Sequence, residues 1–185
     1  MKTSTLSVRP MTAPDVVLIS DYWCTASDDV LRGMGADPAK MPTRDNWHQM
    51  LHTQLETPML EKKSWCMIWL VDDVPAGHCN INKIVPGREA YMHLHLWQSD
   101  GRQKGMGAKL VAMTLPYFFE NYSLEELYCE PYALNPAPNR TLAKVGFKLV
   151  RQEVTTPGIL NFEQEVNLWK ITKKEINLLG YASKK

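Results

Sequence analysis

A short glycine-containing segment carries the residue types that bind a phosphate group. It reads Arg102-Gln103-Lys104-Gly105-Met106-Gly107 and lies between an apolar strand-like run and an amphipathic helix-like run. Glycine lets the backbone approach a ligand closely, so that consecutive N–H groups face a phosphate, and the following helix adds its positive end. The Walker and dinucleotide signatures do not fit, because Ala108 follows Gly107 and a third glycine is missing. The segment therefore predicts a phosphate site of another kind.

Two consecutive strand-like runs, 76–85 and 90–98, alternate polar and apolar residues. Alternation places the polar side chains on one face of a sheet. That face carries His78, Asn80, Asn82, His93, His95 and Trp97. It contains no Lys or Glu at these positions, so the lining of a cavity explains it better than a plain solvent face, which is the alternative.

The residues of this polar face suggest distinct roles. We expect His78, Asn80 and Asn82 to contact a substrate, and His93 and His95 to act as acid–base groups, since imidazole titrates near neutrality. If the Pro86-Gly87 turn makes a simple hairpin, Asn80 lies beside His95 and Asn82 beside His93. No third metal ligand is evident near the two histidines, so we expect no metal.

A further strand-like run, 124–131, leads to a carboxylate. Tyr128, Glu130 and Tyr132 share one face of it. A glutamate among aromatic side chains has its pKa raised by desolvation, towards the range that suits a general base. Two alternatives stay open: a carboxylate in a structural hydrogen-bond network, and base catalysis by His93 or His95, directly or through water.

Two signatures together resemble the GNAT superfamily of N-acetyltransferases. Arg102, Gly105 and Gly107 occupy the defining positions of its acyl-CoA pyrophosphate loop, Arg/Gln-x-x-Gly-x-Gly/Ala. Residues 130–147 resemble its second signature, an Asn, a short helix and then Lys-x-Gly-Phe; here the Asn is Asn135. Asn135 is also a good N-cap, and Gly146 suits a helix end. The resemblance covers roughly residues 64–175.

The resemblance implies an α/β (α+β) fold. The expected sheet is GNAT-like, mixed and mostly antiparallel, with helices on both faces and a V-shaped splay between the strands at about 90–98 and 124–131. One acetyltransferase domain is expected over 1–185, made of an N-terminal part (1–63), an acyl-CoA-binding core (64–147) and C-terminal strands (148–185).

The resemblance also implies an activity, the transfer of an acetyl group from acetyl-CoA to a primary amine by direct attack. The residues expected to bind acetyl-CoA are Trp97, Arg102, Gln103, Lys104, Gly105, Met106, Gly107, Ala108, Asn135 and Arg140. Ribosomal-protein members place a base five residues before the motif Asn, which here is Glu130. Many members carry a Tyr acid where this chain has Leu142, so Tyr128, Tyr132 or solvent would replace it. Tyr128 is also expected to contact the substrate.

Two other functions stay open: a catalytically inert acyl-CoA-binding sensor, which Leu142 favours weakly, and a protein N-terminal acetyltransferase. Residues 27–45 read as a loop, long enough to cover the site and exclude a polypeptide. Asp28 and Asp29 on this loop either attract a cationic amine or form a solvated turn or helix-capping pair. The expected partner is therefore a small-molecule or peptide amine.

The remaining elements must position these groups. A strand at 6–10, a Thr12-capped helix, a second helix from about Thr43 and strands at 64–72, 147–154 and 164–173 are expected. Pro116 should kink the helix from about 105 or end it early.

Composition limits the classes of partner. A net charge of +1 without runs of one sign favours neither nucleic acid nor an anionic membrane. No apolar stretch is long enough for a membrane span or a signal region, so a cytoplasmic location is expected. Four scattered cysteines are expected to be buried thiols. The closing strands are a candidate edge for a homodimer.

Overall fold

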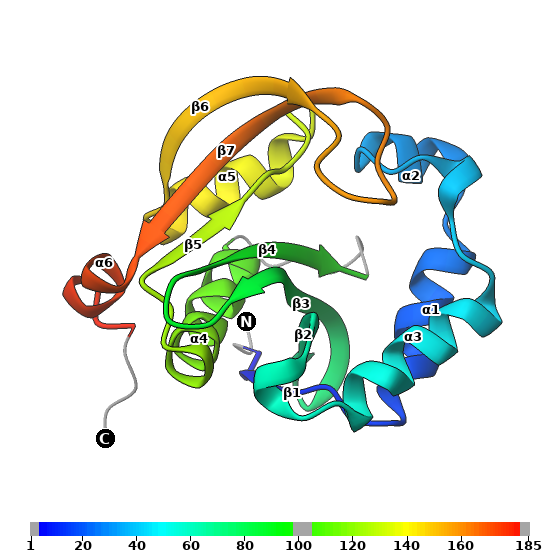
Figure 1. Cartoon of the computed structure of the whole chain (residues 1–185), viewed down its shortest axis with the longest axis horizontal. Helices are drawn as coiled ribbons and strands as arrows, with labels where there is room; N and C mark the ends of the chain where they lie inside the picture. The colour runs from blue at the N-terminus through cyan, green and yellow to red at the C-terminus, as the bar shows by residue number, and fades with distance from the viewer. Residues whose placement is uncertain (1–3, 98–104, 182–185) are drawn as a thin grey trace.

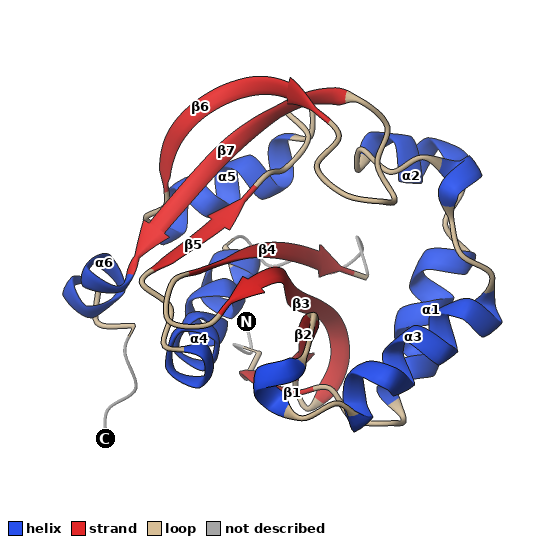
Figure 2. Ribbon diagram, in the orientation of Figure 1, coloured by secondary structure: helices blue, strands red, loops and turns tan. Residues whose placement is uncertain are grey.

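The computed structural model describes residues 4–97 and 105–181, which form a seven-stranded sheet of order β1-β2-β3-β4-β5-β7-β6 (Figures 1 and 2). The strands are β1 (Leu6–Pro10), β2 (Ser64–Val71), β3 (Val74–Val85), β4 (Glu89–Leu96), β5 (Glu126–Cys129), β6 (Lys148–Thr155) and β7 (Gln164–Thr172). Neighbouring strands pair antiparallel, except that β4 and β5 are parallel. The expected mixed, mostly antiparallel sheet is confirmed.

The pairing between β4 and β5 is short. Only Glu89, Ala90 and Tyr91 of β4 pair with β5 in the described part of the chain. Beyond Tyr91 the two strands diverge, as Figure 1 shows. This is the splay expected from the sequence, and it leaves one edge of β4 without a strand partner.

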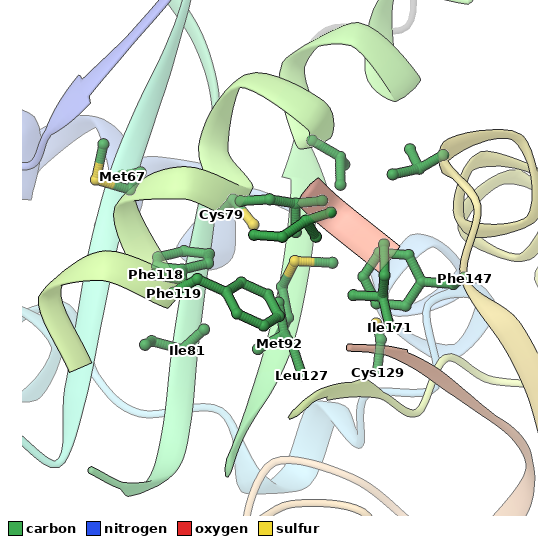
Figure 3. Packing of buried hydrophobic residues seen from close by; sticks show 14 of the residues in the cluster. Met67, Cys79, Ile81, Met92, Phe118, Phe119, Leu127, Cys129, Phe147 and Ile171 are labelled. Atoms are coloured by element: carbon green, nitrogen blue, oxygen red, sulfur yellow. The ribbon is translucent and has the colours of Figure 1, made fainter. Parts of the chain in front are cut away.

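Helices cover both faces of the sheet. They are α1 (Asp15–Cys24), α2 (Asp28–Gly33), α3 (Arg44–Glu56), α4 (Met106–Tyr122), α5 (Pro136–Val145) and α6 (Lys173–Leu178), with short 3₁₀ turns η1 (Pro38–Lys40) and η2 (Met59–Glu61). Alternation along β2 separates two cores, since Cys66 and Ile68 pack with α1 and α3, whereas Met67 and Trp69 pack with α4. Figure 3 shows part of the α4 core, with Phe118 and Phe119 close to the strand residues.

Several helix signals act as the sequence indicates. The Thr43 side chain accepts a hydrogen bond from the backbone of Asn46 and caps α3. The Asn135 side chain caps α5 in the same way. Gly146 ends α5 with φ of 111°, in the left-handed region that glycine adopts without a steric penalty.

The prediction that Thr12 caps the first helix is wrong. Helix α1 begins at Asp15 and has no side-chain cap. The Thr12 hydroxyl instead donates to the buried Asp15 carboxylate, which also receives two hydrogen bonds from Arg9 at 2.6 and 2.8 Å. A buried carboxylate needs donors, and Thr12 supplies two of them, its hydroxyl and its backbone N–H.

Residues 27–45 are not simply a loop, because they contain α2 and η1. The Ser27 side chain caps α2 and Leu31 buries itself in the core, which stabilises this short helix. Asp28 and Asp29 lie exposed in its first turn, where carboxylates interact favourably with the helix dipole.

The early end expected at Pro116 is also wrong, because α4 continues to Tyr122. Proline removes one hydrogen bond, but the next turn buries Phe118, Phe119 and Tyr122. Helix α6 was not expected from the sequence, although Thr172 and Glu175 form a capping box at its start.

The register expected for the β3–β4 hairpin is wrong by two residues. Asn80 pairs with His93, and Asn82 pairs with Tyr91. A bulge between Asn82 and Val85, at which Lys83 has φ of 48°, shifts the pairing. A shift of two residues keeps each side chain on the same face, so the polar face itself is as expected.

Candidate active site

A cavity of about 1490 Å³ occupies the region of the splay. It is lined by α1, α2, α3, β3, β4, the first turn of α4, the end of β5, α5 and residues 157–164. The expected site residues that line it are His78, Asn80, Asn82, His93, His95, Trp97, Gly105, Met106, Gly107, Ala108, Glu130, Tyr132, Asn135 and Arg140. The structure therefore gathers most of the expected site around one space. Arg102, Gln103 and Lys104 lie outside the described residues.

One end of the cavity is the N-terminus of α4. Gly105 is the N-cap, with φ of 90°, and a Cβ there would lie 2.6 Å from Lys144 Nζ. Arg140 and Lys144 of α5 line the same end. A helix N-terminus flanked by two cations fits an anionic group such as a pyrophosphate.

Glu130 lies at the splay, just beyond the last residue of β5. Its side chain is 11% exposed, and Lys83 Nζ lies 3.5 Å from its Oε2. Burial raises the pKa of Glu130, and the charge of Lys83 opposes that shift without cancelling it. Lys83 also lies over the Tyr91 ring, 4.4 Å from its centroid. Glu130 is thus a carboxylate with raised basicity in a cavity.

Asn139, which the sequence analysis missed, holds the segment after Glu130 in place. Its amide nitrogen donates to the backbone oxygens of Tyr132 and Asn135, at 3.1 and 2.7 Å. Its amide oxygen accepts from Asn167 and from the Trp169 indole, at 2.9 and 2.8 Å. These bonds tie α5 to β7. No sequence signal distinguishes Asn139, because the partners that tie it to β7, Asn167 and Trp169, lie about thirty residues further along the chain.

Of the histidines of the polar face, His78 is buried and His93 and His95 are half-buried, and His78 packs against His95. The rings of His78 and His95 stack with centroids 4.7 Å apart, and Trp97 Nε1 donates to His78 Nδ1 at 2.7 Å. Burial lowers the pKa of His78 to about 3 and that of His93 to about 4, and it holds the pKa of His95 well below its usual range. All three are neutral at pH 7 and weakly basic, so Glu130 is the stronger candidate base.

Tyr22, Trp23 and Trp47 extend this packing across the cavity. The Trp23 ring stacks on Trp47, with centroids 5.6 Å apart, and it meets His95 edge-on at 4.8 Å. Tyr22 lies 5.6 Å from the ring of His95. Trp23 and Trp47 are core residues that pack with α1 and α3, and they also line the cavity.

A strap of backbone and side-chain hydrogen bonds encloses the cavity. Gly35 O accepts from Gln164 and Asn161, at 2.6 and 2.8 Å, and Asp37 N donates to Leu160 O at 2.8 Å. Figure 1 shows α2 beside the connection between β6 and β7. We call residues 35–37 and 160–164 the strap. It joins segments more than a hundred residues apart in the chain.

Four buried polar atoms of the described residues have no hydrogen-bond partner, and all belong to residues that line the cavity. They are Trp47 Nε1, Gln54 Oε1, Asn82 Oδ1 and His93 Nε2. Buried polar groups are normally paired. Their gathering here favours a ligand that carries polar groups.

Two expected tyrosine positions contribute differently. Tyr128 does not line the cavity. Its hydroxyl donates to Glu126, and its ring stacks on Tyr91. Burial and the Glu126 carboxylate raise the pKa of Tyr128 to about 12. Tyr132 does line the cavity. Leu142 is fully buried in the α4 core and supplies no acid.

The cysteines are free thiols. Three are buried, as expected, whereas Cys24 is exposed. No group of three or more His, Cys, Asp or Glu side chains within residues 4–97 and 105–181 is arranged to hold a metal ion. The described helices include none that is long and apolar enough to cross a bilayer.

Comparison with known proteins agrees with this architecture. The model of the acetyltransferase (GNAT) domain matches residues 5–148. Among curated proteins, no sequence matches this chain.

Solved structures share the fold at low sequence identity. A spermidine N-acetyltransferase from Vibrio cholerae, in complex with CoA and spermine, has a TM-score of 0.74 and 15% identity over 93% of this chain and 98% of that one. An aminoglycoside acetyltransferase with coenzyme A and kanamycin has a TM-score of 0.71 and 14% identity, over 94% and 98%. A ribosomal-protein-S5-alanine acetyltransferase from Vibrio fischeri has a TM-score of 0.71 and 18% identity, over 94% and 98%.

Proposed function

Because this chain belongs to the GNAT acetyltransferase family, we propose that it transfers an acetyl group from acetyl-CoA to the primary amine of a small molecule. The observation that carries the proposal is the placement of a buried carboxylate, Glu130, and a cation-flanked helix N-terminus in one cavity. An acetyl-CoA-dependent transferase needs both, an anion site for the coenzyme and a base for the amine.

The N-terminus of α4 binds the pyrophosphate of acetyl-CoA. The backbone N–H groups of the first turn are its donors, since they lack partners within the helix. Arg140 and Lys144 add positive charge. The pantetheine arm then extends into the splay, where the edge of β4 beyond Tyr91 pairs with no other described strand and its backbone can pair with the arm.

Glu130 acts as the base. An ammonium has no lone pair, so the acceptor must lose a proton before it attacks. The Glu130 carboxylate takes that proton, and the amine nitrogen then forms a bond to the acetyl carbonyl carbon. A backbone N–H at the edge of β4 stabilises the oxyanion of the tetrahedral intermediate. The nitrogen of the intermediate releases its second proton to solvent, the intermediate collapses, the C–S bond breaks, and the thiolate leaves with the electron pair, to be protonated by Tyr132 or by solvent.

The strap favours a small acceptor over a protein N-terminus. It bridges α2 and the β6–β7 connection over the cavity, with hydrogen bonds of 2.6 to 2.8 Å. A polypeptide would have to pass beside it. A catalytically inert acyl-CoA-binding module is the second candidate, because Leu142 stands where many members of the family carry a tyrosine.

Thermal unfolding with and without acetyl-CoA tests the coenzyme site. Ligand at a hundred times its Kd should add about 2.7 kcal/mol to the free energy of unfolding and raise the Tm by a few degrees. Gly107→Trp should abolish this shift, because the indole would occupy the space between Gly107 and Thr141. Met113→Trp, at an exposed position on α4, should retain it.

Two outcomes would decide against the proposal. If millimolar acetyl-CoA does not raise the Tm of the wild type, the proposal that this cavity binds acetyl-CoA is wrong. A shift without release of free CoA thiol in the presence of any amine would favour the inert module.

A further inference from the structure

Six ring side chains that line the cavity form a connected set of contacts, contributed by α1, α3, β3, β4 and the residue after β4. This aromatic wall consists of Tyr22, Trp23, Trp47, His78, His95 and Trp97. Neighbouring ring centroids lie 4.7 to 5.8 Å apart, from the Trp23–Trp47 stack through His95 and His78 to Trp97. Such spacing is that of packed aromatic pairs, two of them stacked and the others tilted or edge-on, so the wall is a rigid surface made of ring faces and ring edges.

The wall has little charge. The Nδ1 of His78 accepts the Trp97 N–H, so that nitrogen carries no proton. Burial keeps the pKa of both His78 and His95 far below neutrality, and their rings are uncharged at pH 7. They therefore add flat, weakly polar area and do not repel a cation.

Carboxylates are scarce in the cavity. Among the described lining residues only Glu61 and Glu130 carry one, whereas the cations Lys62, Lys63, Arg140 and Lys144 also line it. A buried ammonium needs a counter-charge, and a molecule with several ammonium groups needs several. The cavity supplies one carboxylate at the splay, which suits a single ammonium.

Glu130 and the aromatic wall lie on two diverging strands. Tyr91 and Tyr128 are the last pair between β4 and β5; Glu130 follows Tyr128 by two residues, and His95 follows Tyr91 by four. At the usual rise per residue, His95 is about 13 Å beyond Tyr91 and Glu130 is about 7 Å beyond Tyr128. An acceptor with its ring against His95 and its amine at Glu130 therefore needs an aliphatic linker between the two.

Building on the proposed function, we propose that the acceptor is a primary monoamine with a flat aromatic body, an arylalkylamine, whose ring lies on the aromatic wall while its nitrogen reaches Glu130. The ring gains apolar burial and stacking. Ala36, Leu160 and Gln164 of the strap line the same cavity.

Binding to the CoA-saturated protein tests this directly. Isothermal titration calorimetry with 2-phenylethylamine, spermidine and kanamycin should give 2-phenylethylamine a Kd lower by about ten-fold or more than either polycation, because the ring stacks and the extra ammonium groups find no partner. A polycation that binds as tightly, or the absence of 2-phenylethylamine binding at millimolar concentration, would overturn the proposal.

A matched pair of variants locates the ring. Tyr22 is half-buried on α1 and contacts both His78 and His95, so its replacement disturbs the core less than replacement of Trp23 or Trp47. Tyr22→Leu removes the ring and should weaken 2-phenylethylamine binding about five-fold or more, whereas Tyr22→Phe retains the ring and should change it less than about two-fold. Equal effects of the two variants would place the ligand elsewhere.

A second measurement, thiol release from acetyl-CoA, separates this inference from the proposed function. Acetylation of spermidine but not of 2-phenylethylamine would leave the function standing and overturn the arylalkylamine. If 2-phenylethylamine binds tightly but no amine causes release of CoA thiol from acetyl-CoA, the aromatic site is supported and the proposed acetyl transfer is wrong.

Discussion

The two ends of the cavity are built in different ways. The end proposed to bind the coenzyme uses backbone: the N-terminus of α4 and the start of α5, with two cations beside them. The end proposed to bind the acceptor uses side chains from α1, α3, β3 and β4, beside the strap. A site made of backbone groups requires small residues at fixed spacing, so one short stretch of sequence is enough to predict it. A side-chain site can be assembled from distant segments. Glu130 lies where the two ends meet.

The largest expected effect is that of Glu130→Gln. Loss of the base should lower kcat by about 100-fold or more, while the acetyl-CoA Kd stays nearly unchanged, because the amide keeps the shape but accepts no proton. Steady-state thiol release and a binding titration measure the two quantities. Glu126→Gln is the control, since Glu126 bonds Tyr128 and Lys170 and does not line the cavity. Equal turnover of Glu130→Gln and wild type would remove Glu130 as the base.

The pH dependence of kcat sharpens this assignment. Glu130 works as a carboxylate, so activity should fall as the pH drops through its raised pKa. Lys83 favours the charged form, and Lys83→Gln should therefore move the acid limb of the profile to higher pH. An acid limb that does not move would show that a different group controls it.

The buried histidines should make the acceptor end sensitive to acid. Their folded pKa values lie below the unfolded value of 6.5, so the unfolded chain binds more protons, and stability is lost as the pH falls below about 6.5. Each such histidine contributes up to about 1.4 kcal/mol per pH unit, down to its folded pKa. Urea unfolding between pH 7 and pH 4.5 measures the slope.

Replacement of one histidine tests its share of this pH dependence of the free energy of unfolding. His93→Asn should make stability less dependent on pH, whereas His52→Asn should not, because the His52 ring is exposed in the folded protein. Identical slopes in the two variants would mean that His93 is not held neutral.

The smallest expected effect concerns the strap. A Cβ on Gly35 would lie 2.1 Å from Gln164 Oε1, and the residue has φ of 83°, so Gly35→Ala should displace Gln164 and destabilise the fold by about 1–3 kcal/mol. The acceptor KM should rise a few-fold while the acetyl-CoA Kd stays constant. Gly33→Ala is the matched control, because nothing lies within 4 Å of its Cβ and its φ is ordinary. An unchanged acceptor KM in a folded Gly35→Ala protein would mean that the strap does not close the acceptor end.

Much of the fold was predictable because local signals agree with global packing. Asn135 and Gly146 delimit α5, and the alternation along β3 and β4 separates a polar from an apolar face. The errors arose where tertiary contacts outweigh local signals. Packing carries α4 past Pro116, and a bulge at Lys83 shifts the hairpin register. Both depend on residues that no short window of sequence contains.

By itself the sequence determined the starts of α4 and α5 and the identity of the polar face, because glycine spacing, caps and a period of two act through neighbouring residues. Only the tertiary structure decided what faces that polar face. It packs the stacked pair Trp23 and Trp47 against His95 through the edge of Trp23, joins Gly35 to Gln164 across the cavity, and ties Asn139 of α5 to Asn167 and Trp169 of β7. These contacts link segments far apart in the chain, and side-chain packing, which has no sequence period, brings them together.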